Sequence, residues 1–267
     1  MFDEYSMTNQ MNLAEFTGFT EKEVKGLCEK YEMSFEETKR WYDGYNLKDM
    51  SIYNPRSVVT AIISHDYDNY WSKTENYNAL KVYIEMNFDG LKDTVIELLA
   101  GQKSVIDTTT FSNDMVTFET KDDVLTLLIH LGYLTYDFYT KEISIPNYEI
   151  SEQFASTIKV MGWSEVANSL KQSDELLKVT LRCYEEKVTE LIEKAHSDNT
   201  SILKYNDENS LSCVISLAYY SARKTYTIER ELPAGKGFAD LVFLPRKNNS
   251  NPAMIVELNM TNLLKVR

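Results

Sequence analysis

The sequence is poor in cysteine and histidine, with three of each among 267 residues. Cys28, Cys183 and Cys213 stand far apart, contain no CxxC pair and are odd in number. This excludes a disulfide framework and a cysteine-based zinc site, and it fits a reducing cytoplasm. The histidines show no ligand spacing either, so the candidate site residues are carboxylates.

Long apolar runs and a basic start are absent as well. No segment approaches the apolar length of a membrane span, and Met1-Phe2-Asp3-Glu4-Tyr5 lacks the positive charge of a signal peptide. Hydrophobic residues still make up 43% of the chain and aromatic residues 12%, which predicts a folded core. We therefore expect a cytoplasmic globular protein with no membrane partner.

Positive charge is scarce over most of the chain, and the net charge is −13. Residues 1–197 hold 19 basic and 34 acidic residues, whereas residues 198–267 hold nine basic and seven acidic ones. An acidic surface repels phosphate and disfavours nonspecific nucleic-acid binding. The asymmetry indicates a nucleic-acid-facing C-terminal part and an acidic helical bulk that either meets a protein partner or is simply solvated.

Capping signals and apolar periodicity predict a mostly helical N-terminal region. Thr20 with Glu23 and Ser34 with Glu37 have the spacing of capping boxes, and Pro55 suits the first turn of a helix. Further helices are expected at about 76–86, 89–100, 121–132, 150–161, 164–172, 175–196 and 206–222, with a β-hairpin formed by 133–136 and 142–146.

The most informative stretch lies near the C-terminus, where two apolar runs, 237–244 and 252–258, flank a polar turn. If the turn is centred between residues 248 and 249, Asp240 lies directly opposite Glu257, with Cβ atoms about 4.5–5.5 Å apart. Two carboxylates that close repel each other unless a cation lies between them. Mg²⁺ is held by one or two carboxylates together with water and phosphate, so the pair predicts a magnesium site.

These residues resemble the PD-(D/E)XK nuclease fold, in which an acidic residue on one strand and E-x-K on the next hold Mg²⁺ and activate water against a phosphodiester. The resemblance implies that Asp240, Glu257 and the helix-borne Glu208 are metal ligands. Its catalytic positions are Asp240, Glu257 and Asn259, and the last stands where the lysine is expected. Asn259 cannot supply that positive charge, which predicts a degenerate nuclease with little or no activity.

Upstream stretches resemble a family of bacterial AAA-ATPase-like proteins that carry this nuclease-like domain at the C-terminus. They are Trp41-Tyr42-Asp43-Gly44-Tyr45, Tyr53-Asn54-Pro55-Arg56-Ser57, Asp122-Asp123-Val124-Leu125-Thr126 and Ile145-Pro146-Asn147. The resemblance implies a fragment that lacks the ATPase core and the last nuclease elements. No G-x-x-x-x-G-K-[S/T] occurs, so ATP binding is not expected.

The predicted fold class is α+β. A mostly helical region with a small β-hairpin is expected over 1–197, and a truncated α/β PD-(D/E)XK nuclease-like domain over 198–267. The first functional hypothesis is the degenerate Mg²⁺-dependent nuclease. The second is an acidic non-catalytic binding protein, an inhibitor or decoy of a nucleic-acid-processing enzyme such as a CRISPR effector, whose acidic surface imitates phosphate. Clustering of the acid on one face would favour the second.

Overall fold

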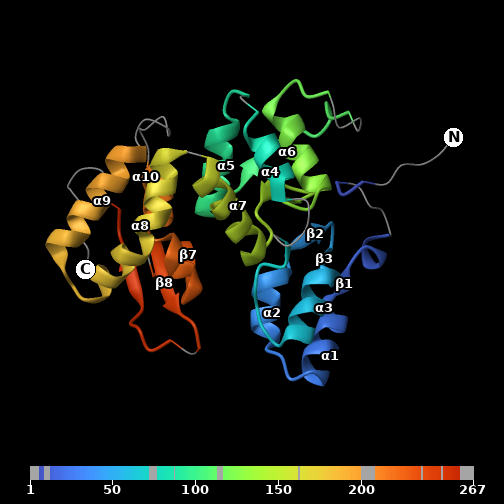
Figure 1. Ribbon diagram of the computed structural model, residues 1–267, viewed down its shortest axis with the longest axis horizontal. Helices are drawn as coiled ribbons and strands as arrows, with labels where there is room; N and C mark the ends of the chain where they lie inside the picture. The colour runs from blue at the N-terminus through green and yellow to red at the C-terminus, as the bar shows by residue number, and fades with distance from the viewer. Residues whose placement is uncertain are drawn as a thin grey trace. The chain divides into compact units, whose positions relative to one another are not determined.

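The computed structural model forms two compact units, Met1–Thr157 (unit 1) and Ile158–Arg267 (unit 2) (Figure 1). It describes residues 6–8, 13–71, 77–86, 88–112, 117–161, 163–199, 208–235, 237–247 and 249–258. Helices predominate and the three sheets are small and antiparallel, so the predicted α+β class is confirmed.

Unit 1 contains two three-stranded sheets, with the orders β1-β3-β2 and β4-β6-β5. The strands are β1 (Phe19–Thr20), β2 (Tyr45–Leu47), β3 (Met50–Tyr53), β4 (Ser104–Val105), β5 (Thr135–Tyr136) and β6 (Glu142–Ser144). The helices are the 3-10 turn η1 (Ala14–Phe16), α1 (Glu21–Lys30), α2 (Phe35–Tyr42), α3 (Pro55–Ser64), α4 (Tyr77–Ile84), α5 (Leu91–Ala100), α6 (Lys121–His130) and α7 (Tyr148–Met161). The predicted hairpin is present as β5 and β6, and β4 adds a strand that the sequence did not predict.

The helix starts of unit 1 follow the capping rules. Thr20 and Glu23 form the complete capping box at α1. Ser34 accepts a hydrogen bond from the Glu37 amide at α2, and the Glu37 carboxylate pairs with Arg40 at 2.9 Å. Asn54 caps α3, whose first residue is the predicted Pro55.

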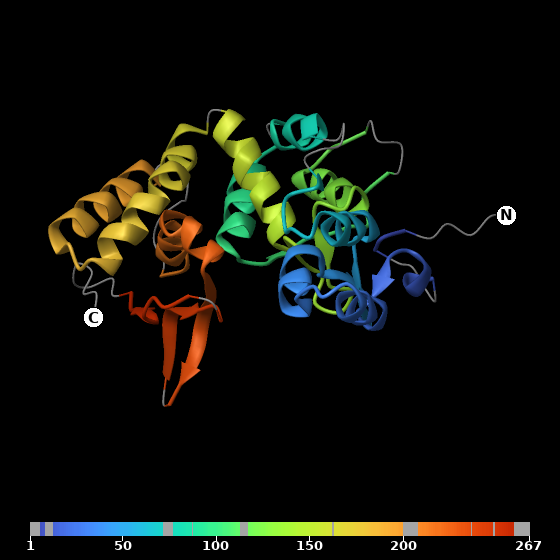
Figure 2. The same cartoon turned by 60° about the horizontal axis from the view of Figure 1, so that its bottom comes forward.

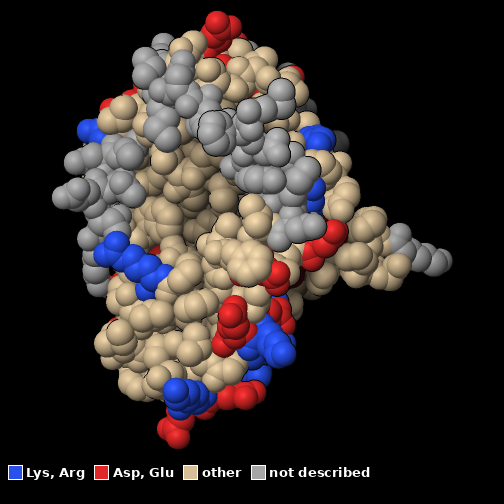
Figure 3. Space-filling model, turned by 90° about the vertical axis from the view of Figure 1, so that its right-hand side faces the viewer, with Lys and Arg blue, Asp and Glu red and all other residues tan. Residues whose placement is uncertain are grey.

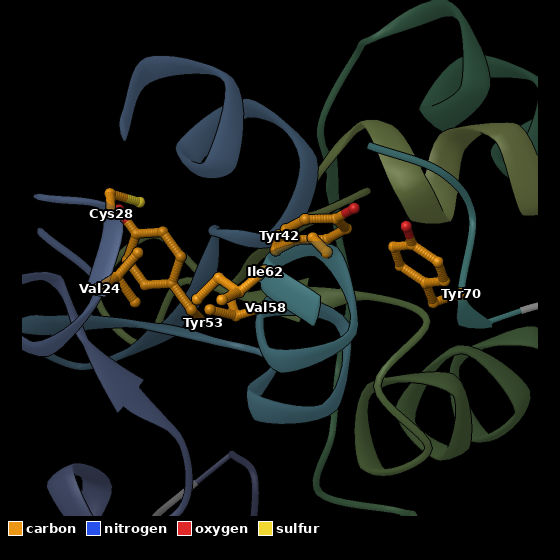
Figure 4. Packing of buried hydrophobic residues seen from close by; sticks show 8 residues of the cluster. Val24, Cys28, Tyr42, Tyr53, Val58, Ile62 and Tyr70 are labelled. Atoms are coloured by element: carbon orange, nitrogen blue, oxygen red, sulfur yellow. The ribbon is translucent and has the colours of Figure 1, made fainter. Parts of the chain in front are cut away.

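Aromatic side chains dominate one core cluster of unit 1, which α1, α2, β3 and α3 build (Figure 4). Its buried members are Val24, Cys28, Tyr42, Tyr53, Val58, Ala61, Ile62 and Tyr70. The Tyr42 hydroxyl donates to the Asp68 carbonyl at 3.2 Å, and the Tyr70 hydroxyl donates to the Asp66 carbonyl at 3.0 Å. Tyr42 and Tyr70 therefore fill the core with their rings and bind backbone carbonyls with their hydroxyls.

Two of the motifs that carry the family resemblance, 41–45 and 145–147, contact each other in unit 1. Gly44 has φ +100°, and a Cβ there would lie 2.0 Å from the carbonyl oxygen of Pro146, so only glycine fits. Asn147 donates from its amide to the Asp43 carbonyl at 2.8 Å and accepts from the Ile150 amide at 3.0 Å. These motif residues join the segment after α2 to the start of α7.

Unit 2 begins with long helices, α8 (Ser164–Leu181) and α9 (Glu185–Asn199), followed by α10 (Glu208–Ala218) and the 3-10 turn η3 (Tyr220–Lys224). The predicted break between 172 and 175 is wrong. Ser173 is buried inside α8 and donates its hydroxyl to the Leu170 carbonyl at 2.9 Å, which keeps it within the helix. The chain turns instead at Cys183, which has φ +56°.

The sheet of unit 2 has the order β7-β8-β9, from β7 (Tyr226–Ala234), β8 (Gly237–Pro245) and β9 (Met254–Val256). Phe243 is fully buried and meets the rings of Tyr219 at 5.4 Å and Tyr226 at 6.2 Å, edge to face. The Tyr219 hydroxyl lies 2.8 Å from that of Thr180 on α8. The distal end of the β7–β8 hairpin extends beyond the helices of this unit (Figure 2).

The compact units divide earlier than the boundary at 197/198 that the family resemblance implies. Helices α8 and α9 pack against α10, which explains why they belong to the same unit as the sheet. None of the described helices has the length and apolar character needed to cross a membrane.

Candidate functional site

The strand register of unit 2 is the one expected from the centred turn. β8 and β9 pair with Leu241 opposite Val256 and Phe243 opposite Met254. The same register places Asp240 opposite Glu257, which directly follows the last residue of β9. The two carboxylates therefore lie across neighbouring strands at one end of the ladder.

The two carboxylates are less buried than the apolar residues beside them. Leu241, Val242, Phe243 and Val256 are buried. Asp240 is half-buried and Glu257 is exposed. Water and ions can therefore reach both carboxylates.

The ladder between β7 and β8 is interrupted at this point. Arg230 pairs with Leu241 and Leu232 with Ala239, but Glu231 and Asp240 between them are not paired. Glu231 has φ +50°, a left-handed conformation that costs a non-glycine residue about 1 kcal/mol or more and bends the strand. Such irregularities often lie next to functional sites, where they redirect side chains.

A cavity of about 330 Å³ lies at the interruption. It is lined by Asn209, Ser212, Arg230, Glu231, Phe238, Asp240 and Leu258. The first turns of α10, the broken part of β7, the adjoining part of β8 and the segment after β9 thus meet around one space. Its volume is at the lower end of the range for small-ligand sites.

Among the described residues, Asp240 has one hydrogen-bond partner. Its Oδ2 accepts a hydrogen bond from the Leu258 amide at 2.5 Å, which fixes the carboxylate beside the end of β9. A carboxylate has about four lone-pair positions, so one donor leaves capacity for a ligand. The hydrogen bond therefore fixes the position of the Asp240 carboxylate and leaves other lone-pair positions available to a ligand.

Arg230 brings the opposite charge to the same cavity. Its Nη1 is buried, and it has no hydrogen-bond partner among the described residues. No ion pair within 4.0 Å joins its guanidinium to a carboxylate in the part of the chain that the structure describes. A buried donor without an acceptor is costly, which marks the position as one where a ligand oxygen would be stabilising.

The described residues supply two carboxylates that can serve as ligands for Mg²⁺. Asp240 and Glu257 provide hard oxygen ligands, and water or phosphate can supply the remainder. Among the described residues no group of three or more His, Cys, Asp and Glu is arranged to hold a metal ion. The side chain of the expected third ligand, Glu208, and the whole of Asn259 lie outside the described residues; Glu208 begins α10, whose next turn lines the cavity.

A second notable carboxylate, Glu149 in unit 1, was missed by the sequence analysis. It is fully buried at the start of α7. Ser57 donates its hydroxyl to both oxygens at 3.0 and 2.9 Å, and the amides of Tyr70 and Trp71 donate to Oε1 at 2.8 and 3.0 Å. Its donors lie far away in the sequence, so no local pattern could have revealed them.

Burial raises the pKa of Glu149 to about 7, although the hydrogen bonds from Ser57, Trp71 and Tyr70 oppose that shift. A shifted carboxyl is often a sign of an active site. None of the cavities described in unit 1 has Glu149 in its lining, and its donors come from core-facing backbone and a buried serine. The hydrogen bonds of Glu149 join α3, the segment before α4 and α7.

The aromatic side chains near α10 are packing residues. Tyr219, Tyr220 and Tyr226 are each at most 4% exposed, so they cannot stack on bases from solution. Phe238 differs, because it is 67% exposed and lines the cavity.

Comparison of the chain with protein-family models, curated proteins and solved structures finds no match, so the family resemblance stays a prediction.

Proposed function

We propose that unit 2 is a nuclease-like module of the PD-(D/E)XK type that binds Mg²⁺ and a phosphodiester but hydrolyses it very slowly or not at all. The observation that supports this is the strand register, which places Glu257 opposite Asp240, together with the cavity that Asp240 lines. Two carboxylates on opposing strand positions are favourable when they share a cation.

The residues have distinct roles in this proposal. Asp240 and Glu257, with Glu208 from α10, hold the ion. Bound Mg²⁺ would polarise the phosphate and lower the pKa of a bound water. Asn259 is neutral and offers no charge to the developing negative phosphate, and the loss of one such donor typically costs about 2.7–4 kcal/mol of transition-state stabilisation. In this proposal the protein still binds Mg²⁺ and a phosphodiester, although it has lost most of its ability to hydrolyse the phosphodiester.

A cleavage assay tests the catalytic part. Single- and double-stranded DNA and RNA are incubated with the protein in Mg²⁺ or Mn²⁺, and we expect no cleavage above that of an Asp240→Ala variant. Robust cleavage that Asp240→Ala abolishes would overturn the assignment of inactivity.

Calorimetric titration with Mg²⁺ tests the binding part. We expect weak binding that Asp240→Asn and Glu257→Gln each remove. Glu229→Gln is the matched control, because Glu229 is also an exposed carboxylate of this sheet but does not line the cavity. Equal Mg²⁺ binding by all of these proteins would end the metal-site proposal.

The acidic binding protein remains a second prediction without a structural observation in its favour. On the face in Figure 3, acidic and basic side chains lie near one another, interspersed with uncharged ones. Glu21 on α1 pairs with both Lys25 and Lys39, which neutralises part of the acidic charge of unit 1. A mixed distribution of this kind favours solvation over phosphate mimicry. Affinity capture from a bacterial lysate that yields a salt-sensitive nucleic-acid enzyme would revive the idea.

A further inference from the structure

We infer that Arg230 and Phe238 form a subsite for single-stranded nucleic acid, in which Arg230 binds a phosphate oxygen and Phe238 stacks on the neighbouring base. The inference rests on the proposed function, because it concerns the same cavity. It goes further in naming the residues that hold the substrate and in predicting that they act without metal.

Arg230 carries the first half of the argument. Its buried Nη1 lacks a hydrogen-bond acceptor among the described residues, and the side chain lines the cavity. Asp240 lines the same cavity, yet the two form no ion pair. A guanidinium that keeps apart from a nearby carboxylate is available to a third charged group, and phosphate oxygens suit its planar donor set.

The other lining groups fit the same ligand. Asn209 and Ser212 lie in the first turns of α10, an eleven-residue helix, and their side chains are polar. Helix N-termini favour anions, although here the effect only adds to that of Arg230. Glu231 and Asp240 work against an anion, so a phosphate is expected on the Arg230 side of the cavity and the metal on the Asp240 side.

Phe238 carries the second half. The side chain is 67% exposed and lines the cavity, and Phe238 lies next to the start of β8, where it pairs with Pro233 of β7. Most of the ring surface is therefore open to a ligand. Aromatic rings next to a cationic phosphate site are the common platform for unpaired bases, because every base offers a π-face. Duplex bases are already stacked on each other, which favours a single strand.

Fluorescence anisotropy with a short labelled oligothymidine, in EDTA and low salt, tests the subsite. We expect Arg230→Gln to weaken binding about tenfold, since a charge-assisted hydrogen bond to phosphate is lost. Lys224→Gln is the matched control, because Lys224 is a mostly exposed cation of the same unit and lies outside the cavity lining. It should change binding by less than about twofold. Equal effects of the two variants would overturn the role of Arg230.

Phe238→Ala should weaken oligothymidine binding about fivefold or more. Ile255→Ala, at another exposed apolar position of the sheet, is its control and should have little effect. Inorganic phosphate should compete with the oligonucleotide in wild type but not in Arg230→Gln. If phosphate binds and Phe238→Ala has no effect, the site is a free-phosphate site and the nucleic-acid inference is wrong.

Two further measurements keep the test decisive. Circular dichroism monitors folding, and Arg230→Met replaces Arg230→Gln if the latter does not fold, because methionine tolerates burial. Arg230→Lys keeps the charge and should retain part of the affinity.

Adding Mg²⁺ should strengthen binding in wild type but not in Asp240→Asn. If Mg²⁺ does not strengthen binding in wild type, the metal proposal is wrong, whereas an unchanged affinity of Arg230→Gln in EDTA contradicts only the subsite.

Discussion

Each unit has one carboxylate with unusual surroundings, and the two are opposites. Glu149 in unit 1 is fully buried and accepts hydrogen bonds from a serine hydroxyl and two backbone amides. Asp240 in unit 2 is half-buried, accepts one hydrogen bond from a backbone amide, and lines a cavity that also contains an unpaired guanidinium nitrogen. The raised pKa of Glu149 draws attention to that carboxylate first.

The number of hydrogen-bond donors distinguishes a carboxylate that stabilises the fold from one that has capacity to bind a ligand. A buried carboxylate whose lone pairs are satisfied by protein stabilises one arrangement of the chain and has no capacity for a ligand. A carboxylate with one donor and open access has capacity left. The number of protein donors and the access to a cavity therefore select Asp240 as the candidate for ligand binding.

The largest expected effect comes from dividing unit 2 itself. A fragment of residues 158–267 should fold, whereas one of residues 198–267 should not. The shorter fragment lacks α8 and α9, which pack on α10, and it loses the hydrogen bond between Thr180 and Tyr219. A sheet of three strands with a single helix buries too little apolar surface to be stable alone.

Circular dichroism and urea unfolding of the two fragments provide the measurement. A cooperative transition for 158–267 and none for 198–267 would agree with the division at Thr157. A stable 198–267 fragment, or its release by limited proteolysis, would favour the sequence-based boundary at 197/198.

The next largest effect should come from Glu149→Ala. The substitution leaves the Ser57 hydroxyl and the amides of Tyr70 and Trp71 without their acceptor, and each unsatisfied buried donor costs about 1–3 kcal/mol. We expect a loss of at least about 3 kcal/mol in the free energy of unfolding of unit 1. Asp240→Ala should cost about 1 kcal/mol or less.

Urea unfolding followed by tryptophan fluorescence measures both variants, because Trp41 and Trp71 lie in unit 1 and Trp163 lies in unit 2 with Asp240. Glu149→Gln is the control: its amide oxygen can still accept hydrogen bonds, so it should lose much less stability than Glu149→Ala. Equal losses for Glu149→Ala and Asp240→Ala would remove the distinction between the two carboxylates.

Glu149 also predicts how the stability of unit 1 depends on pH. Its pKa is about 7 in the folded protein and about 4.5 when unperturbed, so the folded state binds the extra proton between these values. The contribution is fully present below about pH 4.5 and is lost as the pH rises through about 7, an effect of at most about 3 kcal/mol. The nearby Asp68 carboxylate contributes to the shift in the same direction.

Thermal unfolding at pH 5, 6, 7 and 8 measures this effect. The melting temperature of wild type should fall over that range by more than that of Glu149→Gln, which has no proton to lose. Parallel pH profiles for the two proteins would mean that Glu149 does not titrate in this range.

The sequence predicted the local features and missed those that depend on distant residues. The register of β8 and β9 followed from the centre of one turn. The cap at Thr20 and the helix start at Pro55 followed from residues within one helical turn. The surroundings of Glu149 depend on residues about 80 to 90 positions earlier in the chain, at Ser57 and Tyr70, which no local pattern contains.

Other residues were missed because their meaning is geometric. Arg230 looks like an ordinary strand cation in the sequence, and its importance comes from the missing partner and the shared cavity. The turn at Cys183 was missed because cysteine has no preference for a left-handed conformation. Of the candidate site, the pair Asp240 and Glu257 could be placed from the sequence, while the cavity and its positive charge could not.

The smallest predicted effect concerns Glu231, which lies between the two proposed halves of the site. Its carboxylate lines the cavity with Arg230 and opposes an incoming phosphate, so Glu231→Gln should strengthen oligothymidine binding in EDTA about twofold to fivefold. The same change at Glu229, outside the cavity lining, should have less effect. Anisotropy titrations of the two variants at one salt concentration compare them directly. If both strengthen binding equally, the gain reflects the net charge of the unit, and the local assignment of phosphate to this cavity loses its support.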